Sequence, residues 1–289
     1  MEIEMGQSQR LEISCGGLRR MALLRKPKNF HGSAPLVVVL HGAGGTANWT
    51  LEETLWDKYA DEAGFLLLLP EGTREDMTRG AGFLQNPQVW NDGSKRAELA
   101  QQGVDDVAFL EDIIQHVMAM GIVSGNRFFM NGFSNGAGMT FRYCIEAKIK
   151  PAAIAPVSGL LSIDHYPHNL TIPTIYIMGK VDPLMPLEGG TIISPWTKKE
   201  EQRPSVIQTI HAWEKALGGV NHSESRESPE KVHLTERNCG KGGVRFTSVL
   251  IDDLGHHWPG GRGTLNKRLA GQPSNRFHAC SEIWKFWNS

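Results

Sequence analysis

The chain has 289 residues, of which 40% are hydrophobic, a share typical of a globular protein that excludes disorder for most of its length. Its 30 Lys and Arg residues and 31 Asp and Glu residues give a formal net charge of -1. Because binding to a phosphate backbone needs a basic excess, we expect no nucleic-acid partner. The longest apolar runs, Leu36–Leu40 and Phe65–Leu69, are far shorter than the ~20 residues of a membrane span, so we expect no membrane association.

The N-terminus and the cysteines carry little functional signal. The first ten residues contain two glutamates and no apolar stretch, so we expect no signal peptide, which leaves a cytoplasmic protein and a mature secreted form as alternatives. The four cysteines lie far apart without a CxxC pair, which predicts neither a disulfide framework nor a zinc site. One long-range disulfide, for instance Cys239 with Cys280, stays open. The scattered histidines also lack ligand spacing, so we expect no metal and no cofactor.

Strand-like and helix-like segments alternate along the first half of the chain. The pattern predicts a hairpin, a buried strand, a helix, a second buried strand, a polar surface loop and a second helix. In that order these are Leu11–Cys15 with Leu18–Leu24, Pro35–Leu40, Thr50–Ala63, Phe65–Leu69, residues 73–103, and a helix from Val104 that ends at Gly121. Gly64 is a suitable C-terminal cap for the first helix.

The second half continues the alternation. The predicted elements are strand Arg127–Met130, helix Ala137–Ile149, strands Ala152–Val157, Thr174–Met178 and Val244–Ile251, and helix Ser281–Trp287. Residues Glu224–Lys231 are predicted to be a solvated polar loop. Strands that alternate with helices indicate an α/β fold with a mostly parallel sheet and helices on both faces. No linker or repeat divides the chain, so we expect a single domain over residues 1–289.

A GxSxG motif, Gly132-Phe-Ser134-Asn-Gly136, lies between a predicted strand and a predicted helix. In a strand–turn–helix elbow the flanking glycines keep Cβ atoms out of a cramped turn, and the serine hydroxyl projects above the sheet. The motif alone is weak evidence, but its position between a strand and a helix favours a nucleophile elbow over a plain glycine turn. Ser134 is therefore the predicted nucleophile.

A serine nucleophile needs a base, and the base needs an orienting acid, both on loops after later strands. Asp182 follows the strand Thr174–Met178 and is the predicted acid. Three rival carboxylates are less well placed, because Asp164 follows no strand end and the pair Asp252 and Asp253 lies too near the histidines in sequence. The earlier pair, Asp105-Asp106, is predicted to cap the helix that begins there.

Two adjacent histidines, His256 and His257, follow the last predicted strand. Consecutive residues of an extended loop point in roughly opposite directions, so only one imidazole can face the serine and the acid. The oxyanion of a tetrahedral intermediate needs two amide donors. We predict the amide of Asn135 and, from the glycine-rich loop after the strand Pro35–Leu40, the amide of Ala43. That loop lacks the ending of a P-loop and the spacing of a dinucleotide fingerprint, which argues against phosphate binding.

Several motifs occur in one collinear series from about Leu18 to the C-terminus. They are Leu40-His-Gly-Ala-Gly-Gly45, Pro70-Glu-Gly-Thr73, Trp90-Asn91, Val104-Asp-Asp-Val107, Gly132-Phe-Ser-Asn-Gly136, Ala155-Pro-Val-Ser-Gly159, Gly179 to Pro186 with Gly189-Gly190, and Gly255-His-His-Trp-Pro-Gly260. Together they resemble the polyhydroxybutyrate depolymerase / feruloyl esterase group of α/β-hydrolases. The resemblance implies a carboxylesterase for polyesters or for feruloyl or acetyl esters of plant polysaccharides. It also places the base at His256 and leaves His257 as the variable position.

The expected function is thus ester hydrolysis through Ser134, His256 and Asp182, with an ester as the partner and an open oligomeric state. His257 is expected to be a rim residue near the substrate. Trp90 and Trp258, beside the catalytic loops, are candidates to stack on a flat acyl group or to support the fold. Two other functions stay open: a serine peptidase of the same fold, and a non-catalytic binding scaffold.

Overall fold

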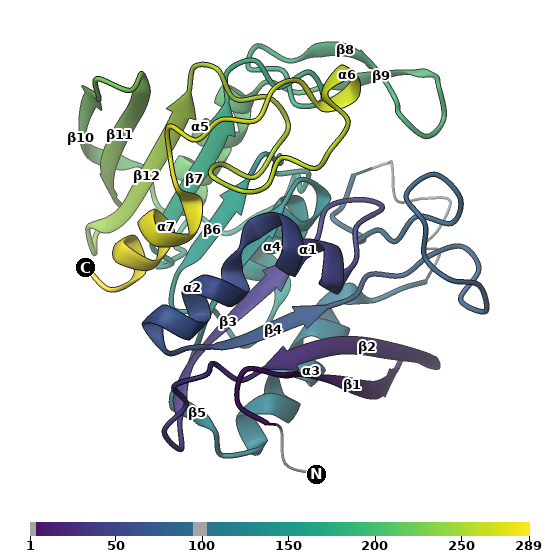
Figure 1. Cartoon of the computed structure of the whole chain (residues 1–289). Helices are drawn as coiled ribbons and strands as arrows, with labels where there is room; N and C mark the ends of the chain where they lie inside the picture. The colour runs from purple at the N-terminus through teal and green to yellow at the C-terminus, as the bar shows by residue number, and fades with distance from the viewer. Residues whose placement is uncertain (1–3, 95–102) are drawn as a thin grey trace.

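The computed structural model describes residues 4–94 and 103–289 and contains a 10-stranded sheet (Figure 1). Its strands are β1 (Ser8–Cys15), β2 (Leu18–Arg25), β3 (Ala34–Leu40), β4 (Leu66–Pro70), β5 (Val123–Phe133), β6 (Ile154–Val157), β7 (Thr174–Gly179), β10 (Val220–Glu227), β11 (Val232–Cys239) and β12 (Val244–Ile251). They are ordered β1-β2-β4-β3-β5-β6-β7-β12-β11-β10 across the sheet. The central strands, from β4 to β12 in this order, run parallel, and antiparallel strands flank them at both edges. The predicted mostly parallel sheet is confirmed.

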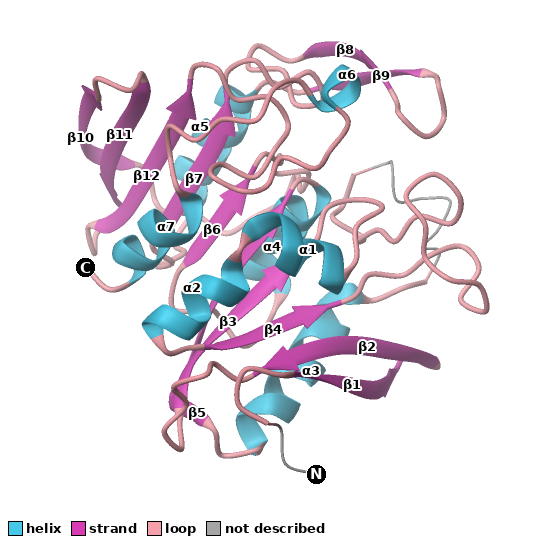
Figure 2. Ribbon diagram, in the orientation of Figure 1, coloured by secondary structure: helices cyan, strands magenta, loops and turns pink. Residues whose placement is uncertain are grey.

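Helices cover both faces of this sheet, as Figure 2 shows. On one face lie α1 (Ala47–Thr54), α2 (Trp56–Ala63) and α7 (Ala279–Trp287); on the other lie α3 (Asp106–Ala119), α4 (Asn135–Glu146) and α5 (Val206–Ala216). The apolar run in β3 follows from this layering. Leu36 and Val38 belong to the core beneath α3 and α4, whereas Val37 and Val39 belong to the core beneath α1, α2 and α7. A strand covered on both faces can be apolar at every position.

The predicted helix Thr50–Ala63 is two helices rather than one. Leu55 has φ 62° and ψ 21°, a left-handed conformation that ends α1 and begins α2. The break turns the chain so that Trp56 is fully buried, with its ring stacked on Trp287 at 6.0 Å. The sequence-based expectation was wrong here because Leu rarely adopts positive φ, so helix propensity alone gives no sign of the break.

Polar strands and two helices, α5 and α6 (Lys267–Ala270), were not predicted. Residues Glu224–Glu227, expected in a loop, belong to the edge strand β10, where every residue is exposed. A short separate hairpin joins β8 (Gly190–Ile193) to β9 (Glu200–Arg203). The helix α5 begins with a capping box at Ser205. Edge strands carry charged residues on both faces, so they lack the apolar alternation on which strand prediction depends.

The remaining expectations concern cysteines, the long loop and the membrane. All four cysteines are free thiols, so the Cys239–Cys280 disulfide is not formed. Of the predicted loop 73–103, residues 95–102 lie outside the described residues. Among the helices of residues 4–94 and 103–289, none has the length and apolar character needed to cross a membrane.

Candidate active site

Ser134 lies in a tight turn between β5 and α4, with φ 55° and ψ -118°. The flanking glycines are required by close backbone contacts. A Cβ at Gly132 would lie 2.1 Å from the Gly136 carbonyl oxygen, and one at Gly136 would lie 2.5 Å from the carbonyl oxygens of Leu40 and His41. Side chains at either position would therefore break the turn. This local geometry is the elbow that the GxSxG motif predicts.

Ser134, His256 and Asp182 come together at the carboxyl ends of β5, β12 and β7. His256 Nε2 lies 2.9 Å from Ser134 Oγ, and its Nδ1 lies 2.7 Å from Asp182 Oδ2. With Nδ1–H donated to the carboxylate, Nε2 is left to accept the serine hydroxyl proton. All three side chains are buried, with Ser134 the most exposed at 7%. Hydrogen bonds between these groups are therefore little weakened by water.

The acid is itself held by the backbone. Asp182 Oδ1 accepts hydrogen bonds from the amides of Leu184 at 2.8 Å and Met185 at 2.9 Å, which leaves Oδ2 for the imidazole. Two of the three rival carboxylates are engaged elsewhere. Asp252 pairs with Lys180 and His233, and Asp253 pairs with Arg276. Asp105 caps α3 through its bond to the Ala108 amide, as predicted.

His257 points away from Ser134 and is not a rim residue. Its side chain is fully buried, and Nε2 lies 3.0 Å from the Gly271 carbonyl oxygen, to which it donates. Burial lowers its pKa, so this imidazole is held neutral. The expectation of a solvent-facing His257 was wrong, because a second loop, around Gly271, packs over this side of the chain.

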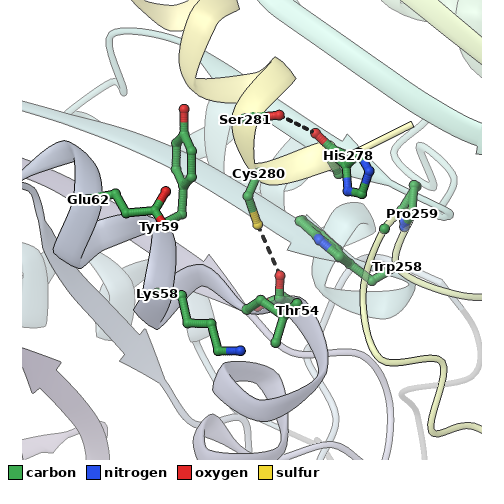
Figure 3. Close-up of a pocket in the computed structure, with 12 residues that line it drawn as sticks. Thr54, Lys58, Tyr59, Glu62, Trp258, Pro259, His278, Cys280 and Ser281 are labelled. Carbon is green, nitrogen blue, oxygen red and sulfur yellow. Dashed lines mark hydrogen bonds between the residues drawn. The ribbon is translucent and has the colours of Figure 1, made fainter. Parts of the chain in front are cut away.

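Trp258 also belongs to the core rather than to the substrate site. It is 1% exposed and packs against Trp56 and Phe133, with ring centroids 6.3 Å and 6.5 Å apart. It borders a separate pocket of about 280 Å³ between α2 and α7, where Cys280 donates to the Thr54 carbonyl oxygen (Figure 3). The indole is part of the apolar core between the sheet and the helices α1, α2 and α7. Trp258 therefore supports the fold.

Among residues 4–94 and 103–289, the backbone amides of Ala43 and Asn135 donate no hydrogen bond. By contrast, the next two amides in the glycine-rich loop are in use, because Gly44 donates to the Gln88 carbonyl oxygen and Gly45 to that of Gly42. Asn135 is the first residue of α4, where backbone amides point out of the helix and favour negative charge. Both residues border one cavity.

The side chain of Asn135 has a structural role that the motif did not predict. It forms two hydrogen bonds with the Trp90 backbone, from the Trp90 amide to Oδ1 at 2.6 Å and from Nδ2 to the Trp90 carbonyl oxygen at 3.0 Å. Trp90 Nε1 donates to the His41 carbonyl oxygen at 2.9 Å, and its ring packs 5.0 Å from the His41 ring. Trp90 is fully buried although it borders the cavity, so its main contacts are with the fold.

His41 joins two loops beneath the site. Its Nδ1 donates to the Gly42 carbonyl oxygen at 2.8 Å, and its Nε2 accepts from the Gly72 amide at 2.9 Å. Complete burial lowers the pKa of His41 to about 4, so the imidazole is neutral near pH 7. A neutral ring can serve as donor and acceptor at once, which both bonds require.

A cavity of about 650 Å³ opens beside Ala43 and Asn135. The loop after β4 lines it through Glu75, Pro87 and Val89, and the β8–β9 hairpin contributes further lining residues. The volume lies in the range of small-molecule sites. In the part of the chain that the structure describes, no group of three or more His, Cys, Asp or Glu residues is placed to hold a metal ion.

Comparison with known proteins assigns the chain to a family. Residues 28–230 match the family model of the phospholipases and carboxylesterases. The chain belongs to this family. Its members have the α/β-hydrolase fold and are carboxylic ester hydrolases, which confirms the fold and the enzyme class expected from the motifs. The matched segment contains Ser134 and Asp182 and ends before His256.

Individual relatives are more distant. A putative esterase, NocK, of Nocardia uniformis subsp. tsuyamanensis is 27% identical over 241 residues, which are 78% of this chain and 66% of NocK. The bifunctional acetylxylan esterase/xylanase XynS20E of Neocallimastix patriciarum is 25% identical over 230 residues, or 80% of this chain and 30% of that protein. The chain thus spans less than two thirds of both. An acetyl xylan esterase from Aspergillus awamori has the same fold, with a TM-score of 0.61 at 13% identity over 97% of this chain and all of that one.

Proposed function

We propose that the protein is a serine carboxylic-ester hydrolase that acts through Ser134, His256 and Asp182. The continuous series of hydrogen bonds from Ser134 Oγ through His256 to Asp182 Oδ2 is the observation that carries this proposal. The nucleophile is in a strained elbow, its base lies within proton-transfer distance, and the acid is fixed by two amides. Family membership and the names of the esterase relatives support the same reaction class.

The reaction follows from the positions of these groups. His256 Nε2 takes the Ser134 proton as Oγ attacks the ester carbonyl, while Asp182 stabilises the imidazolium that forms. The amides of Ala43 and Asn135 hold the oxyanion, and each such donor contributes about 3 kcal/mol to transition-state stabilisation. His256 then protonates the leaving alcohol. In the second half-reaction His256 takes a proton from the water that attacks the acyl-enzyme carbonyl and returns it to Ser134 Oγ as the bond to the acyl group breaks. The carboxylic acid product leaves and the free serine is restored.

The substrate class we propose is an ester of the kinds implied by the motif series: a polyester, or an acetyl or feruloyl ester of a plant polysaccharide. The acetylxylan esterase activity in the names of two similar proteins supports the second group. A panel of p-nitrophenyl acetate, methyl ferulate, acetylated xylan and a hydroxybutyrate polymer film separates these substrates. Turnover of aminoacyl anilides in preference to p-nitrophenyl esters would favour the peptidase alternative instead.

Ser134→Ala tests the nucleophile directly. We expect p-nitrophenyl acetate hydrolysis to fall at least about a thousandfold and labelling by a fluorophosphonate to disappear, with the unfolding transition almost unchanged. Ser225→Ala, at an exposed serine of the edge strand β10, is the matched control and should keep both activities. Retention of one tenth of the native rate in Ser134→Ala would contradict the proposed mechanism.

A further inference from the structure

This inference rests on the proposed function and concerns which part of the ester the large cavity receives. The cavity borders Ala43 and Asn135, the proposed oxyanion donors, but His256 is not among its lining residues. The leaving alcohol must lie near His256, because that imidazole protonates it. The part of the substrate that extends away from His256, past the oxyanion donors, is the acyl group. The cavity is therefore the acyl side of the site.

Two tryptophans line this cavity, Trp90 and Trp196, and they differ in availability. Trp90 is fully buried, and its ring already packs on His41. Trp196 lies in the segment between β8 and β9 and is only partly buried. In Figure 1 this hairpin and the loop that follows β4 lie beyond the arrowheads of the parallel strands. Ser134 directly follows the last residue of β5, one of these strands. Trp196 thus offers ring surface that Trp90 does not.

The indole of Trp196 is fixed by a contact across the cavity wall. Its Nε1 donates to the Phe83 carbonyl oxygen at 2.8 Å, and the two rings lie 5.6 Å apart with a 47° interplanar angle. Phe83 in turn rests on the glycine-rich loop, since a Cβ at Gly44 would lie 2.7 Å from Phe83 Cδ2. Gly44 follows Ala43 directly. A chain of contacts therefore links Trp196 to the proposed oxyanion loop and limits the motion of its ring.

We propose that Trp196 is the specificity-determining aromatic residue of the acyl site, where its ring packs against planar acyl groups. A fixed, partly exposed indole loses little conformational entropy when a flat group stacks on it. Trp90 and Trp258 were the sequence-based candidates for stacking on a flat acyl group. We assign that contact to Trp196 of the β8–β9 hairpin instead. Phe83 acts as a positioning residue that holds the indole through its carbonyl oxygen and its ring.

Two esters with the same leaving group and the same linker isolate this contact: p-nitrophenyl 3-phenylpropanoate and p-nitrophenyl 3-cyclohexylpropanoate. The ratio of their kcat/KM values reports the preference for a planar over a puckered ring and cancels effects on the chemical step. We expect Trp196→Ala to lower this ratio by about fivefold, the scale of one aromatic contact, and Trp196→Phe to keep most of it. Phe83→Ala should lower the ratio in the same direction.

Leu84→Ala is the matched control, because Leu84 neighbours Phe83, is 66% exposed and does not line the cavity. It should leave the ratio unchanged. If Trp196→Ala does not fold, Trp196→Leu and Phe83→Ala carry the same test. An unchanged ratio in the Trp196 and Phe83 variants, with ester hydrolysis still dependent on Ser134, would overturn the inference and leave the proposed function intact. Hydrolysis that does not depend on Ser134 would instead contradict the proposed function.

Discussion

At the scale of single residues, the neighbours His256 and His257 have opposite environments. His256 contacts Ser134 and Asp182, and its ring packs 4.9 Å from that of Phe133. His257 is turned away and donates to the Gly271 carbonyl oxygen. The two adjacent histidines can therefore be assigned different roles. His256 belongs to the proposed chemistry, and His257 stabilises the fold.

Alanine at each position should separate these roles. His256→Ala should lower kcat by several orders of magnitude with little change in the free energy of unfolding, because it removes the proposed base. His257→Ala should lower the free energy of unfolding by about 1–3 kcal/mol, because it leaves a buried carbonyl oxygen unpaired, and should lower kcat about tenfold at most. Steady-state kinetics on p-nitrophenyl acetate and urea unfolding of both variants give the ranking. The reverse ranking would move the base to His257.

Residue identity and spacing predicted Ser134, Asp182 and the pair His256-His257, since each follows a strand in the sequence. The resemblance to the depolymerase and feruloyl esterase group then selected His256 as the base. The same reasoning could not orient Trp258 or His257. Which way a loop side chain points depends on what packs over it, and the segments involved, α2 and the loop at Gly271, are distant in sequence. Those contacts are decided by tertiary packing alone.

At the scale of elements, α1 supports the loop that follows the proposed base. The Glu53 side chain is 1% exposed, and its carboxylate accepts hydrogen bonds from the Gly263 amide at 2.9 Å and from both the amide and the hydroxyl of Thr264. Its carbonyl oxygen accepts from the Arg262 amide at 3.0 Å. A buried carboxylate is tolerated when donors compensate its desolvation, and here the loop that follows His256 supplies them.

Glu53→Gln tests this support. The amide group replaces one acceptor oxygen with a donor that faces other donors, so we expect the free energy of unfolding to fall by about 2 kcal/mol in urea unfolding. Glu52→Gln, at the exposed neighbouring residue, is the matched control and should change it by less than about 0.5 kcal/mol. Equal effects of the two substitutions would mean that the Glu53 contacts do not stabilise the loop.

Apolar elements were predicted better than polar ones. The buried strands β3, β4, β7 and β12 were located to within a residue or two, because an apolar run bounded by glycine or proline is a local signal. The exposed strand β10 and the partly buried strand β11 pair through their backbones and depend on β12 as a template. Backbone pairing does not require alternating apolar side chains, so the sequence of these strands resembles that of a loop.

At the scale of the whole molecule, the two cores on opposite sides of the sheet join distant parts of the chain. Trp56 of α2, Trp287 of α7 and Trp258 of the loop that follows β12 pack in one of them. His41 is buried at the point where β3 and β4 end, and both its ring nitrogens are engaged. Its protonation state should therefore affect the unfolding of the whole molecule.

The pH dependence of stability has a definite sign. The pKa of His41 is lowered to about 4 in the folded state from 6.5, so its contribution is complete above about pH 6.5 and is lost as the pH falls toward 4. The unfolded chain binds a proton in this window and the folded chain does not, which costs roughly 3 kcal/mol over the whole range. Urea unfolding at a series of pH values between 7.5 and 4.5 measures this loss.

His41→Gln should be less stable at pH 7.5 but should lose less stability on acidification than the native protein. His222→Gln, at an exposed histidine of β10, should reproduce the native pH dependence. Parallel curves for the native protein and His41→Gln would show that the pKa of His41 is not lowered in the folded state.

The sequence by itself determined the α/β layering, the elbow at Ser134 and the placement of Asp182 and His256 after strands. These features depend on local steric rules, on apolar runs and on the rule that parallel strands end at one edge of a sheet. Only the tertiary structure decided the break at Leu55, the burial of His257 and Trp258, and the position of Trp196 on the cavity. Each of these depends on contacts between segments far apart in the chain, and a single sequence carries no local signal for such contacts.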